Sequence, residues 1–363
     1  MVVSVWAFDD GYGDNKLFNG VNDILIPSHC TTWIKPMKGE EMGEGRVIDP
    51  LSHIGIEIEG IEGKFLVGRG ALEQDTSLNW TGGSNKHKDS NFPIIAKACL
   101  GVLAGSRPNV VVEPIVMGLP VKEDESEDRH ALLKDIIVGT HKMIIHFADG
   151  RRMIKEITVK ELVTKKQPFG TFCDLILDRR GEIIDAEMAR GFNVIVDIGT
   201  RTLNIYTLDA LTPITELSDT FNQGVHTAYD LVNEFINERL GFKVPTGKIA
   251  GTVQKGEIRG IDLTKARERS YQVLANEVFK IVDTMMVNSW VYVDNLIITG
   301  GGAELLRNYL ANMFPVKPKF MNRFSTARGF WKYGIRHMVK IKKKSIQIAM
   351  PNGGAMQVGM NSK

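Results

Sequence analysis

Residues 194–206 read VIVDIGTRTLNIY, and this stretch decides how the rest of the chain is interpreted. It opens with three β-branched residues in a row, which is typical of a buried strand. The strand ends at Asp197, turns at Gly199 and continues into a second alternating apolar segment. The pattern predicts a β-hairpin with a carboxylate at its mouth, where Gly199 permits the positive φ of a tight turn. Thr200 and Thr202 add hydroxyl donors beside free backbone N–H groups, so the turn is suited to hold a phosphate.

Two further segments repeat the same theme. Residues 5–18, VWAFDDGYGDNKLF, again pass from an apolar strand through Asp9 and Gly11 to a second strand, now with Lys16 added. Residues 296–306, LIITGGGAELL, place three glycines between a buried strand and the start of a helix. One such turn alone is most often an ordinary hairpin. Three in one chain indicate a nucleotide site, because glycines allow close approach and helix N-termini favour anions.

Length and composition favour a globular protein of two domains. The chain has 363 residues, a length that exceeds the usual size of a single core. Its residues are 43% hydrophobic and 24% charged, which is ordinary for a globular protein. No apolar run approaches the ~20 residues that span a bilayer. The opening residues read as a strand and not as a secretory signal. The three cysteines show no CxxC spacing, so we expect reduced thiols in a cytoplasmic protein.

The charge balance argues against direct nucleic-acid binding. A formal net charge of +2 and a pI near 8.3 are too balanced to mark a nucleic-acid binder, so any link to DNA would be local or indirect. Residues 76–90 contain GGSNKHKDS, which lacks the spacing of a P-loop and is predicted to be a solvated loop. No histidine is expected near the three glycine motifs to act as a strong base.

Strands and helices alternate along the chain, which predicts an α/β fold with helices on both faces of its sheets. Residues 92–104 and 267–287 have the apolar spacing of helices, and residues 174–190 are also expected to form one. Residues 246–261 are interpreted as a Gly- and Lys-rich connector. Gly224 precedes a well-patterned helix, whose N-terminus is a further candidate anion or ribose site.

In this order and at these separations, DDGYGDNKLF, DIGTRTLNI and ITGGGAELL resemble the phosphate and adenosine motifs of the actin, hexokinase and heat-shock-chaperone superfamily. GLP at residues 118–120, QPFGTF at 167–172 and ARGFWKYG at 327–334 are most similar to ParM-type bacterial actins, the plasmid-segregation filament proteins. The resemblance covers nearly the whole chain. It implies two duplicated ribonuclease-H-like domains around a nucleotide cleft, with residues 1–192 and 324–363 in domain I and 193–323 in domain II.

The resemblance also implies roles for individual residues. Asp9 and Asp197 would hold Mg²⁺, Lys16 would bind phosphate, and Gln167 would orient the attacking water. From the residues alone, Gln167 either points into a cleft or lies on a surface loop. The other implied nucleotide contacts are Gly11, Tyr12, Gly13 and Asp14 in the first turn, Gly199, Thr200, Arg201 and Thr202 in the second, and Gly300, Gly301, Gly302 and Glu304 around the adenosine. Arg201 departs from the family's small residue, which alters the second turn or adds a phosphate contact.

These groups suit a slow Mg²⁺-dependent NTPase, using ATP or GTP. Phosphoryl transfer needs charge neutralisation and an in-line nucleophile more than covalent chemistry. A glutamine orients water but cannot accept its proton, which favours slow hydrolysis coupled to a conformational cycle. In the actin-like picture, the closed form joins its neighbours head to tail, and such heterologous contacts generate filaments.

The resemblance implies a partner beside the chain itself, a ParR-type adaptor bound to plasmid centromere DNA. The basic residues 336–345 are either a solvated tail or a docking surface for an adaptor or filament neighbour. No membrane partner is expected. An alternative reading is a small-molecule kinase of the same superfamily, acting on a sugar or pantothenate-like alcohol. A chaperone-like NTPase module is disfavoured, because no separate substrate-binding β-domain follows.

Overall fold

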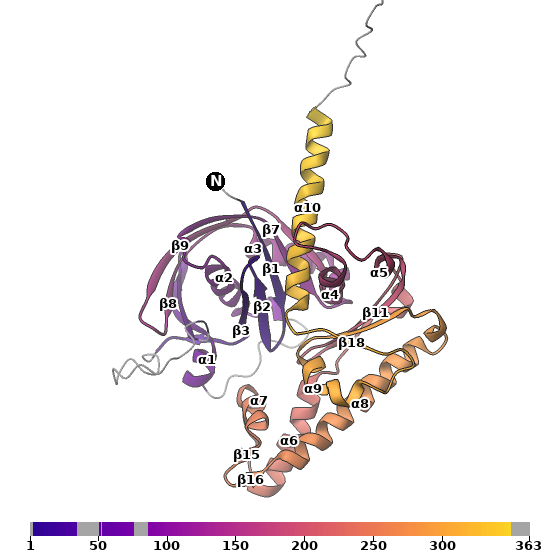
Figure 1. Ribbon diagram of the computed structural model, residues 1–363. Coiled ribbons are helices and arrows are strands. Elements are labelled where there is room, and N and C mark those ends of the chain that lie inside the picture. The colour runs from indigo at the N-terminus through magenta and orange to yellow at the C-terminus, as the bar shows by residue number, and fades with distance from the viewer. Residues whose placement is uncertain (1–2, 35–50, 52, 76–85, 350–363) are drawn as a thin grey trace, which may run out of the picture.

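Two β-sheets carry the fold. A computed structural model of the chain describes residues 3–34, 51, 53–75 and 86–349 (Figure 1). Ten strands pair in one sheet and six in the other, and a two-stranded hairpin stands apart. The predicted α/β class is confirmed. No helix within these described ranges is long and apolar enough to cross a membrane.

The ten-stranded sheet curls round on itself. Its strand order is β3-β2-β1-β7-β9-β8-β5-β6-β4, with β10 beside β7. The strands are β1 (Val3–Asp10), β2 (Asp14–Phe18), β3 (Asp23–Pro27), β4 (Cys30–Thr32), β5 (His53–Ile58), β6 (Ile61–Gly68), β7 (Asn109–Leu119), β8 (Gly139–Phe147), β9 (Arg152–Val159) and β10 (Leu162–Lys166). Because the two edge strands, β3 and β4, are consecutive in the chain, the sheet bends until its edges approach each other. Residues 23–33, whose β-branched residues and proline are typical of an edge strand, contribute the two edge strands β3 and β4.

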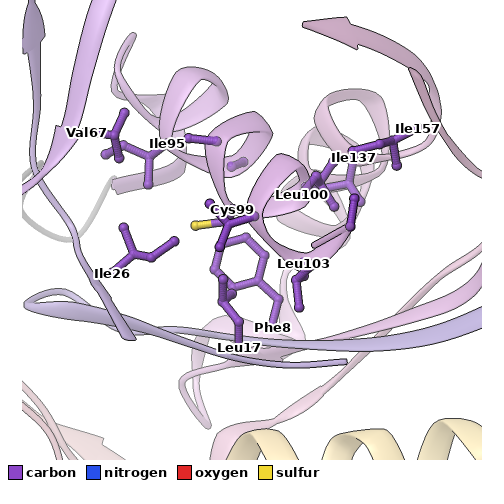
Figure 2. Close-up of a cluster of buried hydrophobic side chains, with 14 of the residues drawn as sticks. Phe8, Leu17, Ile26, Val67, Ile95, Cys99, Leu100, Leu103, Ile137 and Ile157 are labelled. Atoms are coloured by element: carbon purple, nitrogen blue, oxygen red, sulfur yellow. The ribbon is translucent and has the colours of Figure 1, made fainter. Parts of the chain in front are cut away.

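One helix fills the inside of this curled sheet. The helices of this part are α1 (Arg69–Gln74), α2 (Phe92–Leu103) and α3 (Glu127–Ile137), with short 3₁₀ turns η1 (Lys86–Lys88) and η2 (Glu123–Glu125). Helix α2 is buried on nearly all sides, as expected of a helix that is apolar all round. Figure 2 shows Cys99 and Leu103 of α2 against Phe8 and Leu17 of the sheet.

The six-stranded sheet has helices on both faces. Its order is β13-β12-β11-β17-β18, with β14 beside β12. The strands are β11 (Phe192–Ile198), β12 (Leu203–Asp209), β13 (Thr212–Pro213), β14 (Asp219–Phe221), β17 (Asn295–Thr299) and β18 (Lys319–Phe320). The helices are α4 (Gln167–Ile176), α5 (Ala186–Arg190), α6 (Val225–Leu240), α7 (Thr246–Lys255), α8 (Thr264–Met286) and α9 (Gly301–Leu310), with η3 (Thr215–Leu217) and η4 (Trp290–Tyr292). Helices α8 and α9 pack on one face, and α4 and α5 on the other.

Helix α4 lies between the two sheets and is held there by α10 (Ser325–Ala349). It contacts β7 and β10 of the larger sheet and β11 and β12 of the smaller one. The two helices approach so closely that a Cβ on Gly329 would lie 1.7 Å from the carbonyl oxygen of Gly170. Beyond this crossing, α10 runs past β1 and β7 and then projects from the body (Figure 1).

The prediction of one helix over residues 174–190 is wrong. Helix α4 ends at Ile176 and α5 begins only at Ala186. The Asp178 carboxylate accepts the backbone N–H groups of Arg180 and Glu182, both at 2.8 Å, and so makes a turn where the helix would continue. Ile184, in the middle of the expected helix, is 65% exposed.

The connector expected over residues 246–261 is also wrong. It contains α7 and a small hairpin of β15 (Glu257–Ile258) and β16 (Ile261–Asp262). Ile249 and Val253, four residues apart, bury one face of α7 in a small cluster with α6. Gly256 then ends the helix in the left-handed conformation, with φ 77°.

We expect the core around α2 to dominate the stability of the first part of the chain. Ile95 is fully buried there, whereas Ile154 of β9 is exposed. Ile95→Ala should lower the free energy of unfolding by about 2–5 kcal/mol, because it leaves a cavity. The matched variant Ile154→Ala should cost less than about 1 kcal/mol. Denaturant unfolding of both variants checks this, and equal losses would contradict it.

Candidate functional site

The two predicted hairpins are built alike. In the β1–β2 hairpin, Asp9 lies opposite Lys16, and in the β11–β12 hairpin, Asp197 lies opposite Asn204. A parallel strand pairs with the other side of each acid-bearing strand. Asp9 lies in register with Gly118 of β7, and Asp197 with Thr299 of β17. The same position of each hairpin therefore carries an acid at the end of a buried strand.

The hairpins meet across a narrow cavity of about 40 Å³. A Cβ on Gly13 of the first turn would lie 2.4 Å from the Thr200 hydroxyl of the second, so the two turns touch. Glycine is required at this contact because a larger residue would push the hairpins apart. The cavity is lined by Asp9, Gly11, Tyr12, Asp14, Lys16, Gln167, Asp197, Gly199, Thr200, Thr202, Asn204, Gly301 and Arg323.

Two acids and one base set the electrostatics of this cavity. The Lys16 ammonium bonds to Asp9 Oδ2 at 2.9 Å. Burial lowers the pKa of Lys16, but attraction to Asp9 and Asp197 outweighs it, so the pKa lies above its ordinary value. Burial, together with repulsion from Asp9, raises the pKa of Asp197 to about 7, although Lys16 opposes the change. One lysine thus lies beside two buried carboxyl groups, and the raised pKa of Asp197 shows that it does not fully offset the cost of charging both.

Gln167, the first residue of α4, points into the cavity and not onto a surface loop. Its amide nitrogen donates to Asp9 Oδ1 at 3.1 Å and to the Asp10 carbonyl at 3.3 Å. Its amide oxygen accepts a bond from Asn204 at 3.4 Å. The side chain is therefore held between the two hairpins, beside the first carboxylate.

Several of the implied nucleotide contacts do not line the cavity. Gly224 and Gly302 serve close packing, because a Cβ on either would lie about 2.5 Å from the second hairpin. Gly300 adopts φ 90°, which a side chain would strain. Glu304 instead binds Arg323, which does reach the cavity. The implied residues outside the lining are Gly13, Arg201, Gly224, Gly300, Gly302 and Glu304.

Two details of the turns differ from expectation. Gly199 has no positive φ; its N–H donates to the Thr202 carbonyl at 2.8 Å, which closes the turn. The Arg201 guanidinium lies 5.6 Å from the Tyr12 ring centre. Arg201 therefore links the second turn to the first by a cation–π contact.

Sequence reasoning missed four polar residues at or beside the site. Asn204 was detectable, since the hairpin register sets it opposite Asp197. Arg323 lies far along the chain from the motifs and carries no local signal. Lys86 and His87 were placed in a solvated loop, yet both are buried against Asp10, with His87 Nε2 2.7 Å from Asp10 Oδ2. That prediction is wrong for these residues; residues 76–85 of the loop lie outside the described part.

Family models cover both halves of the chain. The N-terminal domain of actin-like proteins matches residues 7–170, and the C-terminal part of the archaeal actin homologue MreB-like family matches residues 195–312. An archaeal actin homolog from Thermoplasma volcanium is 26% identical over 340 residues, which are 90% of this chain and 97% of the relative.

Solved actin-like structures share the fold. A ParM filament from Clostridium botulinum gives a TM-score of 0.76 at 22% identity, over 93% of this chain and 100% of that one. ParM from Bacillus thuringiensis with ATP gives 0.65 at 16% identity, over 93% and 99% of the two chains. An archaeal actin homolog in complex with ADP gives 0.66 at 20% identity, over 94% and 100%.

The chain has an actin-like fold. At the level of the fold, the resemblance to the ParM-type bacterial actins is confirmed by the solved ParM structures that align with nearly all of the chain.

The raised pKa of Asp197 predicts a pH-dependent cost in the ligand-free protein. A carboxyl whose pKa is higher when folded contributes stability that is fully present below its unfolded value of about 4, and loses it as the pH rises through about 7. At pH 8, Asp197→Asn should therefore stabilise the ligand-free protein, on the order of 2 kcal/mol. Near pH 4 the difference should vanish. Thermal melts of both proteins at the two pH values check this, and a variant less stable than the parent at pH 8 would contradict it.

Proposed function

We propose that this chain is a filament-forming actin-like ATPase that segregates plasmid DNA by dynamic polymerisation. The observation that carries the proposal is the convergence of Asp9, Lys16, Gln167 and Asp197 on one cavity between two similar hairpins. The relatives solved with ATP and ADP support a nucleotide as the ligand. Under this proposal the domains are residues 1–192 with 324–363, and 193–323.

The residues of the cavity fit a bound Mg²⁺. This ion prefers oxygen ligands and is commonly held by one or two carboxylates together with water and substrate phosphates. Asp9 and Asp197 supply the carboxylates, and their uncompensated charge favours a cation. No group of three or more His, Cys, Asp or Glu in the described ranges is arranged to hold a metal ion by itself, so water and phosphate would complete the shell. When bound, the ion would neutralise charge on the phosphates.

The side chains divide the remaining work. In the ligand-free protein, the Lys16 ammonium bonds to Asp9. When the cleft widens to admit a nucleotide, it would bond to a phosphate oxygen instead. The backbone N–H groups of the two turns offer neutral donors to the other phosphate oxygens. Gln167, beside Asp9, would orient a water for in-line attack but cannot remove its proton. This division predicts slow hydrolysis of ATP, with GTP as a possible second substrate.

Self-assembly is supported by an exposed apolar surface, which we call the end patch. It consists of Leu211, Val291 and Tyr292, the last two being 83% and 65% exposed. All three lie at the end of the six-stranded sheet that is remote from the cavity, where β11 begins. Leu211 is presented with φ 70°, a conformation that non-glycine residues rarely adopt. Exposed apolar side chains at one end of a molecule suit a head-to-tail contact.

A role in plasmid segregation rests on the ParM relatives and requires a link to DNA. The proposed link is a ParR-type adaptor bound to centromere DNA, because the chain's net charge of +2 offers no general DNA-binding surface. The projecting end of α10, which carries basic residues from Arg336 onward, is a candidate contact for that adaptor or for a filament neighbour.

The deciding experiment follows light scattering and sedimentation of the purified protein with Mg²⁺, before and after addition of ATP or GTP, with phosphate release measured in the same sample. Polymer that forms on nucleotide addition and disassembles after phosphate release supports the proposal. Phosphate release without polymer would overturn it in favour of the kinase alternative, and the search would turn to an acceptor alcohol.

Gln167→Ala should slow hydrolysis and spare assembly. The variant removes the amide that lies between Asp9 and Asn204, so the attacking water loses its orientation. We expect a loss of about tenfold or more in the rate of phosphate release, because small misplacements of a reacting group are costly. Phosphate release from preformed filaments measures this rate. A variant that hydrolyses at the parent rate would remove Gln167 from the reaction.

Tyr292→Asp should block assembly while nucleotide binding persists. A charge on the end patch would be buried unpaired in any contact made there. Sedimentation should show at least about a tenfold rise in the critical concentration, if the variant costs 1.4 kcal/mol or more per contact. Ile154→Asp, at an exposed isoleucine on the ten-stranded sheet, is the control and should assemble normally. Unchanged assembly of Tyr292→Asp would show that the end patch is not an interface.

A further inference from the structure

Behind the first hairpin, on the side away from the cavity, lies a buried charged cluster. Asp10 follows Asp9 on β1, and successive side chains of a strand point to opposite faces. The Asp10 carboxylate is bound by the Lys86 ammonium and by His87 Nε2. All three residues are at most 5% exposed. Lys86 and His87 both come from η1, the short turn that precedes α2.

The cluster reaches the backbone of the phosphate turn itself. Besides Asp10, the Lys86 ammonium donates to the carbonyl oxygen of Gly11. It also lies 5.7 Å from the ring centre of Tyr12, whose hydroxyl donates to Glu123 Oε1 at 3.1 Å. Three consecutive residues, 10 to 12, are thus held from behind by one lysine.

Such a cluster is a poor way to gain stability alone. Burying charges costs desolvation energy that apolar side chains of similar volume avoid. Here the charges are paired, since Lys86 and His87 both bond to the Asp10 carboxylate. What a charged cluster offers and an apolar one does not is a directed bond to a particular backbone oxygen.

The bond to Gly11 fixes the direction of the next N–H group. In a planar trans peptide, the C=O of Gly11 and the N–H of Tyr12 point in opposite directions. With the Gly11 oxygen drawn back to Lys86, the Tyr12 N–H points away from Lys86, toward the side on which Gly11 and Tyr12 line the cavity. A backbone N–H in this place is a donor suited to an anionic oxygen.

We propose that Lys86, held by Asp10 and His87, is a positioning residue that orients the Gly11–Tyr12 peptide so that its N–H meets a phosphate oxygen of the nucleotide. The inference rests on the proposed nucleotide site and extends it to residues outside the cavity. Lys86 does not touch the ligand; it acts through the peptide.

The test compares ATP with adenosine, which lacks phosphates, by calorimetric titration. The variant is Asp10→Asn/Lys86→Met, which removes both charges and leaves neither unpaired. We expect it to lose about tenfold or more in ATP affinity, the loss of one bond to a charged group, with adenosine affinity unchanged. The variant Asp10→Asn/Lys86→Gln, which keeps an N–H donor at residue 86, should recover part of the ATP affinity that Asp10→Asn/Lys86→Met loses.

A second buried lysine provides the matched control. Lys155 of β9 is fully buried and donates to the carbonyls of Gly105 and Arg107, at 2.5 and 2.8 Å, in the loop after α2. Lys155→Met should lower the melting temperature but leave ATP affinity unchanged. If the double variant binds ATP as the parent does, or loses ATP and adenosine affinity equally, the inference is overturned. A parent that binds neither ligand would instead overturn the proposed function.

Hydrogen exchange of the unmodified protein gives an independent test that needs no variant. If the lysine positions the turn before the ligand arrives, the Gly11 amide, whose N–H donates to the Asp9 carbonyl at 3.1 Å, should exchange slowly without nucleotide, and the Tyr12 amide should gain protection when ATP is added. Rapid exchange of the Gly11 amide without nucleotide, with protection only after ATP is added, would contradict the inference even if the double variant failed to fold.

Discussion

The repulsion between two buried carboxylates, Asp9 and Asp197, is the constraint on which the rest of the structure depends. Each lies near the end of an interior strand of a separate sheet, so the two sheets cannot approach at this point without bringing like charges together. Lys16 offsets part of this cost, and the remaining charge favours an ion between the hairpins. The protein thus gives up stability in its ligand-free form, and a bound cation and nucleotide would restore it.

Helix α4 contacts both the charged residues of the cavity and the two sheets that pack on either side of it. Its first residue, Gln167, contacts Asp9 and Asn204, one from each hairpin. One turn later, the Thr171 hydroxyl bonds at 3.0 Å both to Thr299 of the smaller sheet and to Thr326 of α10. A change in the separation of the hairpins therefore acts on the same helix that holds the sheets together. This arrangement gives a physical route from the cavity to the outer surfaces, including the end patch.

Local sequence was sufficient where one segment carries its own signal. Both hairpins and the strand before Gly300 were predicted, because apolar alternation and turn residues lie within a few positions of each other. Asp178 shows where such signals fail, since its side-chain bonds to the backbone end a helix that apolar spacing would extend. Helix α7 was missed because its stability comes from packing against α6, which sequence spacing does not reveal.

The site was predicted less fully than the fold. Its acids, its lysine and its glutamine follow from the motifs, but Lys86 meets Asp10 across 76 residues of chain. No pattern within either segment predicts that pairing. The polar residues around Lys86 are typical of a solvated loop. Only the curl of the larger sheet, which brings η1 behind β1, shows that these polar residues are interior.

That curl has a consequence for how copies of the chain can join. Strand edges with free N–H and C=O groups are the usual route by which proteins add to one another as continuous sheet. Here β3 and β4 turn toward each other, and the edges of the smaller sheet, β13 and β18, are two residues long. Growth by strand addition is thereby disfavoured among the described strands. A polymer of this protein would be held by side chains between closed bodies, and each subunit could leave it without unravelling.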